Sequence, residues 1–335
     1  MEIFVVDDSA FMRKVVTDLL EKMPNVKVSN VARNGKQALT LLENEQPDVV
    51  LLDVEMPILN GLETLKKIKE KYDTPVIMLS ALTNKEVTIE ALNLGAADFV
   101  EKPTNIKEIQ DEWIRDFYRK IKNVARTNKR LSISHEPMTL PKKTGETQLP
   151  SKVRAVVIGA STGGPKSLIK IIQDLKAPLN VPIFIVQHMP KGFTTSFAQR
   201  MNEESSVEVK EAENDELILN KVYLCPGDYH MTIINGRIIL NQEEKVHGTR
   251  PAVDYLFKTA AKVYGNGLVA FILTGMGKDG AAGMAQVERF GGYNIAQDKE
   301  TSVVFGMPKH AIESGVVHEI LTLEAIGDKL KQMVR

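Results

Sequence analysis

The chain is poor in cysteine, in net charge and in long apolar runs, and each shortage excludes a class of protein. Its one cysteine, Cys225, can form neither an internal disulfide nor a cysteine-based zinc site. No apolar run approaches the ~20 residues that a membrane helix needs, and acidic residues interrupt the N-terminus before a signal-peptide core could form. Lysine and arginine (43) balance aspartate and glutamate (43), so the basic charge typical of nucleic-acid binding is missing. We therefore expect a cytoplasmic protein that neither inserts into a membrane nor binds nucleic acid.

Length, composition and charge distribution predict two folded parts joined by a linker. With 335 residues, 43% of them hydrophobic, the chain is long enough for about two domains that each bury a core. The net charge is −4 over residues 1–122, +4 over residues 123–152 and zero over residues 153–335. The middle segment carries several Pro, Ser, Thr and Lys residues without an apolar period, which is typical of a linker. We expect domains at 1–122 and 153–335, with a linker at 123–152.

The first domain alternates apolar runs with stretches of helical spacing. Strands are predicted at residues 3–6, 26–32, 49–52, 76–79 and 98–100, and helices at 11–23, 35–42, 61–70, 85–94 and from about 105. The runs at 49–52 and 76–79 are apolar throughout, as in strands that are buried on both faces. This alternation of strands and helices predicts a five-stranded parallel sheet with helices on both faces.

The last domain repeats the alternation. Strands are predicted at residues 153–158, 182–186, 222–224, 233–240 and 268–273, and helices at 165–175, 194–201, 253–263 and 280–290. Asn235-Gly236 is a hairpin signal, because both residues tolerate the positive φ angles of a two-residue turn. These features predict a second, doubly wound and mainly parallel α/β domain that includes an antiparallel hairpin.

Polar side chains follow four of the predicted strands in the first domain. Asp7 and Asp8 come after the first strand, Asp53 after the third, and Ser80 and Lys102 after the fourth and fifth. Because the carboxyl ends of parallel strands share one edge of a sheet, we expect these side chains to converge. Three carboxylates would repel one another, and a hard cation such as Mg²⁺, which prefers oxygen ligands, would offset that repulsion. The ammonium and hydroxyl groups could hold the oxygens of a phosphoryl group.

These residues resemble the motif of a response-regulator receiver domain. The match covers residues 1–122 and rests on the Asp7-Asp8 pair, on Asp53 with Met56-Pro57 and Gly61, on Ser80-Ala81 and on Lys102-Pro103. The resemblance implies a flavodoxin-like (CheY-like) fold in which a histidine kinase phosphorylates Asp53.

The same resemblance implies a metal site and a switch. Mg²⁺ would be held by Asp8, Asp53 and the backbone carbonyl of Glu55, with Asp7 acting mainly through water. The residues that would respond to phosphorylation are Ser80, Phe99 and Lys102. Ser80 is expected to move toward the phosphoryl group, and the ring of Phe99 to follow it.

A glycine-rich turn opens the last domain. The run at 159–165, Gly-Ala-Ser-Thr-Gly-Gly-Pro, follows a predicted strand and precedes a predicted helix. It lacks both the G-x-G-x-x-G pattern of dinucleotide-binding loops and the Gly-Lys-Ser/Thr ending of a Walker loop. Two interpretations remain. Ser161 is either a helix cap in an ordinary turn, or a nucleophile whose hydroxyl lies at the sheet edge beside a helix N-terminus, where developing negative charge is favoured.

A base and an acid for Ser161 follow two other predicted strands. His188 follows the strand at 182–186, and Asp279 lies in the loop after the strand at 268–273. A serine nucleophile needs a histidine to accept its proton and an acid to orient that histidine, and a triad is defined by geometry rather than by chain order. The three residues are therefore predicted to share one crevice. The backbone N–H groups of Thr162 and Met276 are candidate donors to an oxyanion.

The motifs of the last domain resemble the chemotaxis protein-glutamate methylesterase (CheB) family, in which a receiver domain precedes a catalytic domain. The matching residues are the 159–165 turn, Gln187-His188-Met189-Pro190, Pro226-Gly227 with His230-Met231, Arg250-Pro251 with Val253-Asp254, the 274–280 loop and Gly306-Met307-Pro308. The resemblance implies Ser161 as nucleophile, His188 as general base and acid, and Asp279 as the orienting acid. It places the Met276 amide in the oxyanion hole, with Thr162 in support.

The family resemblance also implies a substrate and partners. The enzyme would hydrolyse glutamate γ-methyl esters of chemoreceptors to glutamate and methanol through an acyl-enzyme, and would deamidate receptor glutamines. A chemotaxis histidine kinase would be the phosphodonor, and no cofactor is expected in the esterase site. We expect the unphosphorylated receiver to cover the hydrolase crevice and phosphorylation at Asp53 to expose it.

Two features depart from the family pattern, and two other functions remain as alternatives. Thr249 stands directly before the Arg-Pro pair, where relatives carry a histidine, and His247 lies two residues earlier, which leaves the role of this loop open. Cys225 is expected to be a packing residue. The last domain could be a regulatory binding module without turnover, although the intact Ser-His-Asp set speaks against it. A DNA-binding regulator ranks far lower, because the domain has no net charge and no evident helix-turn-helix.

Overall fold

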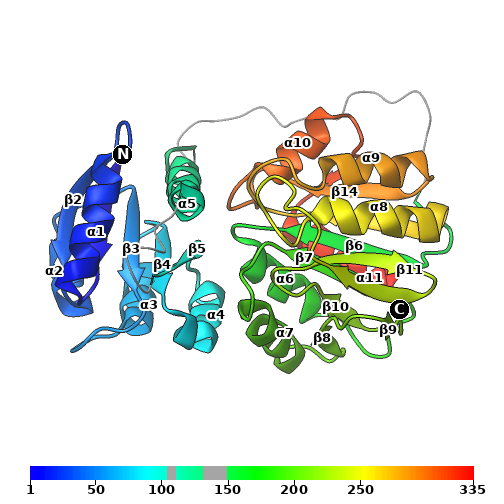
Figure 1. Cartoon of the computed structure of the whole chain (residues 1–335), viewed down its shortest axis with the longest axis horizontal. Helices are drawn as coiled ribbons and strands as arrows, with labels where there is room; N and C mark the ends of the chain where they lie inside the picture. The colour runs from blue at the N-terminus through cyan, green and yellow to red at the C-terminus, as the bar shows by residue number, and fades with distance from the viewer. Residues whose placement is uncertain (104–110, 131–148) are drawn as a thin grey trace. The chain divides into compact units, whose positions relative to one another are not determined.

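A computed structural model describes residues 1–103, 111–130 and 149–335. The chain divides into two compact units, Met1–His135 and Glu136–Arg335 (Figure 1). Each unit is built around its own parallel sheet.

The first unit is a five-stranded sheet in the order β2-β1-β3-β4-β5, with every neighbouring pair parallel. Its strands are β1 Glu2–Val6, β2 Lys27–Ala32, β3 Val49–Asp53, β4 Val76–Ser80 and β5 Asp98–Glu101. Its helices are α1 Ala10–Glu21, α2 Gly35–Leu42, α3 Gly61–Lys71, α4 Lys85–Asn93 and α5 Asp111–Arg130, with a short 3₁₀ turn at Leu82–Asn84. All residues of β3 and β4 are buried, as their unbroken apolar runs predicted. The predicted receiver fold is confirmed.

Side-chain caps fix where the helices of the first unit begin. The Ser9 hydroxyl accepts a hydrogen bond from the N–H of Met12, so α1 starts directly behind the Asp7-Asp8 pair. Asn60 and Glu63 form a capping box at the start of α3. These caps hold the loops after β1 and β3 in short, defined conformations at one edge of the sheet.

Helix α5 continues past residue 122, where the first domain was predicted to end, and reaches Arg130. Its buried positions Phe117, Ile121 and Val124 follow the predicted helical spacing, and Trp113 stacks on Phe117 with ring centroids 4.9 Å apart. The predicted start of this helix near Asn105 lies outside the described residues. The boundaries at 122 and 152 stay predictions.

The second unit has a seven-stranded, wholly parallel sheet in the order β15-β14-β13-β6-β7-β10-β8. Its strands are β6 Ala155–Ala160, β7 Ile183–Gln187, β8 Val209–Glu211, β10 Val222–Leu224, β13 Leu268–Ile272, β14 Tyr293–Gln297 and β15 Glu319–Leu321. Its helices are α6 Gly164–Ile172, α7 Phe193–Glu203, α8 Val253–Tyr264, α9 Ala281–Arg289, α10 Met307–Glu313 and α11 Leu323–Met333, and a 3₁₀ turn spans Gly265–Gly267. Figure 1 shows α8 and α9 on one side of this sheet and α6 and α7 on the other. The doubly wound α/β arrangement is confirmed.

A small antiparallel sheet accompanies the parallel one. It consists of β9 Glu216–Leu217, β11 His230–Ile234 and β12 Arg237–Asn241, in the order β11-β12-β9. Asn235 and Gly236 have φ angles of 50° and 75° and form the two-residue turn between β11 and β12, as predicted. A single strand over 233–240 was therefore wrong, because this turn divides the run in two.

Strand β6 lies between β13 and β7, and helix α8 packs closely against it. Gly159 makes this approach possible, since a Cβ atom there would lie 2.5 Å from Cγ1 of Val253, the first residue of α8. The close contact sets the position of the N-terminus of α8 relative to the ends of three neighbouring strands.

We expect Gly159→Ala to destabilise the second unit, because the added methyl group overpacks the contact with Val253. The free energy of unfolding should fall by ~1–3 kcal/mol. Urea unfolding of the full chain can distinguish the two units. Tryptophan fluorescence reports on the first unit, because the single tryptophan, Trp113, lies in α5, whereas circular dichroism reports on both units. Gly327→Ala is the matched control, since a Cβ there meets nothing closer than 3.6 Å and should stabilise α11 by up to ~1 kcal/mol. Equal stability of Gly159→Ala and the unaltered chain would refute the packing argument.

Candidate functional sites

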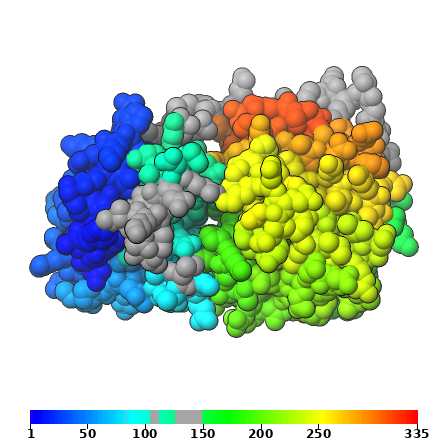
Figure 2. Space-filling model, in the orientation of Figure 1, coloured from blue at the N-terminus to red at the C-terminus, as the bar shows by residue number. Residues whose placement is uncertain are grey.

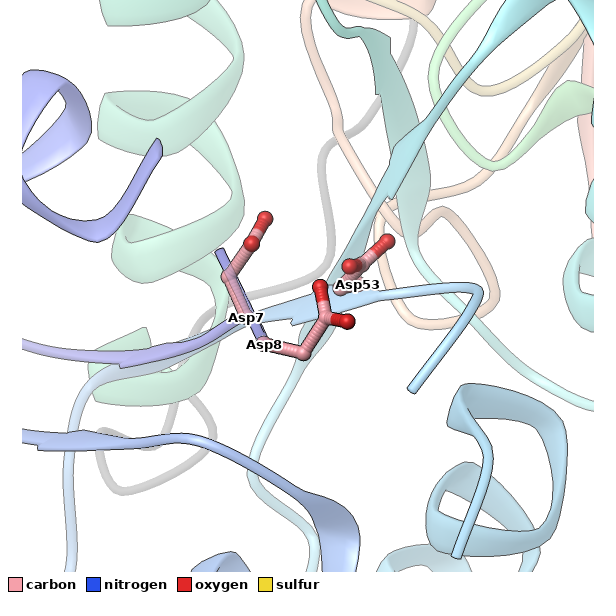
Figure 3. Close-up of side chains that lie close together, drawn as sticks. All are labelled: Asp7, Asp8 and Asp53. Atoms are coloured by element: carbon pink, nitrogen blue, oxygen red, sulfur yellow. The ribbon is translucent and has the colours of Figure 1, made fainter. Parts of the chain in front are cut away.

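Three aspartates converge at one edge of the first sheet (Figure 3). Asp7 and Asp8 follow β1, and Asp53 ends β3. One carboxylate oxygen from each lies within 4.8 Å of the other two. Asp7 and Asp53 are buried and Asp8 is exposed. The strands are neighbours in the sheet, so the predicted convergence follows directly from strand order.

Lys102 is the cation that faces this cluster. Its Nζ lies 2.8 Å from Oδ2 of Asp7 and 2.7 Å from Oδ1 of Asp53. The N–H of Glu55 donates a hydrogen bond of 3.3 Å to the same Oδ1 of Asp53. Thus one ammonium is shared between two buried carboxylates, while the third carboxylate, that of Asp8, is exposed.

Burial raises the pKa of Asp53 to about 6. Lys102 opposes this shift by stabilising the carboxylate, whereas the negative charge of Asp7 adds to it. The folded protein therefore holds the Asp53 proton more tightly than the unfolded chain does. Protonation of Asp53 therefore adds to the free energy of unfolding at acid pH. This contribution is lost as the pH rises from about 4 toward about 6.

Two of the three predicted switch residues, Ser80 and Phe99, are turned into the protein. The buried Ser80 hydroxyl hydrogen-bonds to the hydroxyl of Thr88 and donates to the carbonyl of Ala81 at 3.1 Å. Phe99 is buried. Lys120 of α5 lies over its ring, with Nζ 5.1 Å from the ring centroid, and donates a hydrogen bond of 2.6 Å to the Phe99 carbonyl oxygen. In this conformation the hydroxyl is engaged with α4 rather than with the aspartate cluster.

In the second unit, Ser161 follows β6, the central strand of the site. Its N–H donates to the carbonyl of Thr274 at 3.0 Å, and its carbonyl accepts from Nε2 of Gln187 at 2.9 Å. A Cβ atom on Gly275 would lie 2.8 Å from Cβ of Ser161, so the loop after β13 lies directly against the serine. Ser161 is therefore tied by its backbone to the ends of both flanking strands. The role of Gln187 in holding the Ser161 backbone was not predicted from the sequence.

His188 and Asp279 meet at this edge. His188 Nε2 lies 2.8 Å from Oδ2 of Asp279. The carboxylate is 2% exposed, and it also accepts hydrogen bonds from the N–H groups of Val253 (2.7 Å) and Asp254 (3.0 Å), the first two residues of α8. Burial opposes ionisation of Asp279, but the hydrogen bond and charge of His188 and the α8 amides together lower its pKa below the ordinary value.

The two predicted oxyanion residues lie on loops that are joined to each other. Thr162 is buried and Met276 is half-buried. The Thr274 hydroxyl donates to the carbonyl of Thr162 at 2.9 Å, and Gly275 accepts at its carbonyl from the N–H of Met307 at 2.8 Å. The turn that carries Thr162 and the loop that carries Met276 are thus held in one arrangement.

The remaining residues singled out from the sequence have structural contacts. His230 is buried, accepts from the N–H of Ala252 at Nδ1 (3.2 Å) and donates from Nε2 to the carbonyl of Glu244 (3.1 Å). Cys225 is buried in the core, and burial raises the pKa of its thiol. His247 lies at the tip of a turn and approaches Asp254, with Nε2 3.7 Å from Oδ2.

Comparisons with known proteins cover both units. Residues 156–330 match the model of the family described as CheB methylesterase, and residues 3–113 match that of the response regulator receiver domain. The protein-glutamate methylesterase/protein-glutamine glutaminase of Pyrococcus abyssi is 45% identical over 349 aligned residues, which cover 100% of this chain and 94% of the relative. The protein of the same name from Thermotoga maritima is 42% identical, with 100% and 98% covered.

A solved structure resembles the second unit. The crystal structure of the Thermotoga maritima CheB methylesterase catalytic domain aligns with a TM-score of 0.52 at 46% sequence identity, covering 55% of this chain and 100% of that domain. Among the described residues, no helix combines the length and the hydrophobicity needed to cross a membrane.

The charges around Asp53 generate a prediction about its pKa in metal-free protein. Lys102→Met should raise this pKa further, by ~1 unit or more, because the nearest cation is lost. Asp7→Asn should lower it, because a neighbouring negative charge is lost. Carboxyl ¹³C chemical shifts recorded against pH measure both changes. Lys14→Met is the control, since Lys14 pairs with Asp18 on the surface and should leave the Asp53 titration unchanged. Shifts of the same sign in the two site variants would contradict the assignment of causes.

Proposed function

Because the chain belongs to the CheB methylesterase family of hydrolases and carries a response regulator receiver domain at its N-terminus, we propose that it demethylates glutamate γ-methyl esters of chemoreceptors. Methanol and glutamate are the products, and receptor glutamines are deamidated by the same chemistry. The observation that carries this proposal is the hydrogen bond between His188 and the buried Asp279 beside Ser161, at the ends of three neighbouring strands.

The geometry supports a serine-hydrolase mechanism. Asp279 engages Nε2 of His188, which leaves Nδ1 as the nitrogen that accepts the Ser161 proton. The serine oxygen then attacks the ester carbonyl, and the protonated histidine returns the proton to the departing methanol. Water attacks the resulting acyl-enzyme with the same histidine as base, which frees the glutamate and regenerates the serine. The buried carboxylate stabilises the imidazolium that forms in each half of the reaction.

The N–H groups of Thr162 and Met276 are the proposed donors to the tetrahedral oxyanion. They lie on the turn after β6 and the loop after β13, which Thr274 and Gly275 hold together. Fixed donors need no reorganisation as the negative charge develops, which is why losing one donor typically costs ~2.7–4 kcal/mol of transition-state stabilisation.

The receiver is the proposed regulatory input. We assign Asp53 as the residue phosphorylated by a chemotaxis histidine kinase. The cluster of hard oxygen ligands fits Mg²⁺, with Asp8, Asp53 and the Glu55 carbonyl as proposed ligands and Asp7 acting mainly through water. Bound there, the cation would neutralise negative charge at the phosphoryl group. Lys102 already contacts Asp53 and is placed to pair with a phosphoryl oxygen, while Ser80 and Phe99 are the proposed switch residues.

Replacement of the nucleophile tests the chemistry. Ser161→Ala should lower methanol release from methylated receptor membranes by more than ~10³-fold, because no acyl-enzyme can form. Ser205→Ala is the matched control, since its hydroxyl donates only to the carbonyl of Val207 away from the site, and it should retain full activity. A folded unaltered chain that binds matched receptor but releases no methanol would favour a binding module without turnover.

Replacement of the phosphoacceptor tests the regulation. A small phosphodonor with Mg²⁺ should raise methanol release by the full chain, and Asp53→Asn should abolish the rise while retaining the basal rate. Residues 150–335 alone should hydrolyse faster than the intact unphosphorylated chain if the receiver is inhibitory. Equal rates for the isolated part and the intact chain would refute inhibition, without bearing on the ester chemistry.

A further inference from the structure

A second acid, Asp254, lies beside the hydrogen-bonded pair of His188 and Asp279. It is the second residue of α8, and its side chain is 15% exposed. Its Oδ1 accepts hydrogen bonds from the N–H groups of Gly280 (3.0 Å) and Gly283 (2.6 Å). These are the amides of the N-cap residue and of the third residue of α9, and the N-cap directly follows Asp279.

The two acids cap each other's helices. Asp279, which precedes α9, accepts from the first two amides of α8. Asp254, which belongs to α8, accepts from amides at the start of α9. The N-cap positions themselves, Ala252 and Gly280, contribute no side-chain cap. Since the first four amides of a helix have no partner within it, each carboxylate supplies what the other helix lacks.

Close helix packing makes this exchange possible. Helices α8 and α9 lie side by side (Figure 1). A Cβ atom on Gly283 would lie 2.6 Å from Cβ of Phe257 and 3.1 Å from Cα of Asp254. Gly280 has a φ of 93°, a conformation that glycine adopts without strain. Gly280, the residue that follows Asp279, thus combines a positive φ with a hydrogen bond from its N–H to Asp254.

The arrangement carries an electrostatic cost. Burial and the charge of Asp279 raise the pKa of Asp254 to about 6. The helix amides and His247, whose Nε2 lies 3.7 Å from Oδ2, act in the opposite direction. Each carboxylate is held near the other by its own pair of helix amides, and neither can move without releasing the amides that donate to it. Figure 2 shows the region around residues 250–260, in yellow, at the surface of the second unit.

We propose that Asp254 is a positioning residue of the hydrolase site, which holds the Gly280 backbone and thereby orients the Asp279 carboxylate toward His188. The kinetic part of this inference rests on the proposed function, whereas its geometric part does not. Loss of the Asp254 side chain frees two buried amides, so the loop that carries Asp279 loses its anchor. The effect reaches the substrate only through His188, and so it should alter turnover rather than substrate binding.

Kinetics of three variants of the full chain test this role. Asp254→Ala should lower kcat for ester hydrolysis by ~10–100-fold, because small misplacements of catalytic groups have effects of this size. KM should stay within about twofold of the value for the unaltered chain, because Asp254 does not contact the substrate. Asp254→Asn keeps an oxygen that can accept from both amides and should recover most of kcat. Thr322→Ala is the matched control, since it removes the side-chain cap of α11 in the same unit and should leave kcat unchanged.

Three kinetic outcomes would overturn the proposal. They are an unchanged kcat in Asp254→Ala, an equal loss in Thr322→Ala, and an Asp254→Asn variant as slow as Asp254→Ala. If Asp254→Ala does not fold, Asp254→Ser replaces it, because a hydroxyl on a shorter side chain cannot span both amides. The same fall in kcat is then expected, and full activity would overturn the proposal.

A spectroscopic readout separates this inference from the proposed function. The ring N–H proton that His188 shares with Asp279 should give a low-field ¹H resonance in ¹⁵N-histidine-labelled protein, identified by its loss in His188→Gln. This resonance should shift or vanish in Asp254→Ala and persist in Thr322→Ala. If the unaltered chain releases no methanol, the proposed function fails, but the resonance still decides whether Asp254 orients the pair. An unchanged resonance in Asp254→Ala would refute the proposal that Asp254 orients the pair of His188 and Asp279.

Discussion

The structure of the second unit depends on how one buried negative charge is held. Asp279 is almost fully removed from solvent, and a carboxylate in that position requires hydrogen-bond partners to remain ionised. Two of its partners are amides at the N-terminus of α8, and the third is His188. This requirement fixes α8 over the end of β6, which in turn demands a residue without a side chain at Gly159. Packing and electrostatics therefore impose the same position on the helix.

The first unit meets the same constraint with a different result. Asp53 is also buried, yet one ammonium, that of Lys102, is shared between it and Asp7. Among the described residues, this shared cation does not offset the burial of Asp53, and the pKa of Asp53 rises to about 6. For Asp279, fixed amides and a histidine more than offset burial, and its pKa falls. The contrast suits the proposed roles: the triad acid keeps a constant charge, whereas the receiver cluster retains unbalanced negative charge that a cation can neutralise.

The sequence predicts the strands that are most apolar and the residues that directly follow them. Ser161, His188 and Asp279 were placed together because parallel strand ends share an edge, and the last two form the expected hydrogen bond. Strands β8, β9, β14 and β15 were missed, because they are short or carry polar residues such as the buried Asn294. The cross-capping by Asp254 was also beyond prediction. It depends on the separation of two helices, which no local pattern in the sequence encodes, although the missing side-chain caps at Ala252 and Gly280 are visible there.

Strand order explains why this site needs so many glycines. Ser161 follows the central strand, whereas His188 and Asp279 come from the strands on either side and must meet across its end. The chain after β6 has to leave room for that contact. A Cβ atom on Gly164 would lie 2.1 Å from Oε1 of Gln187, and one on Gly163 would lie 2.5 Å from Cβ of Val303. The glycine-rich run, which at first suggests a phosphate-binding loop, is required here by close packing. Glycines in the turn after the central strand leave room for Gln187 on one side and Val303 on the other, and the chain order of serine, histidine and aspartate is the order of the strands that they follow.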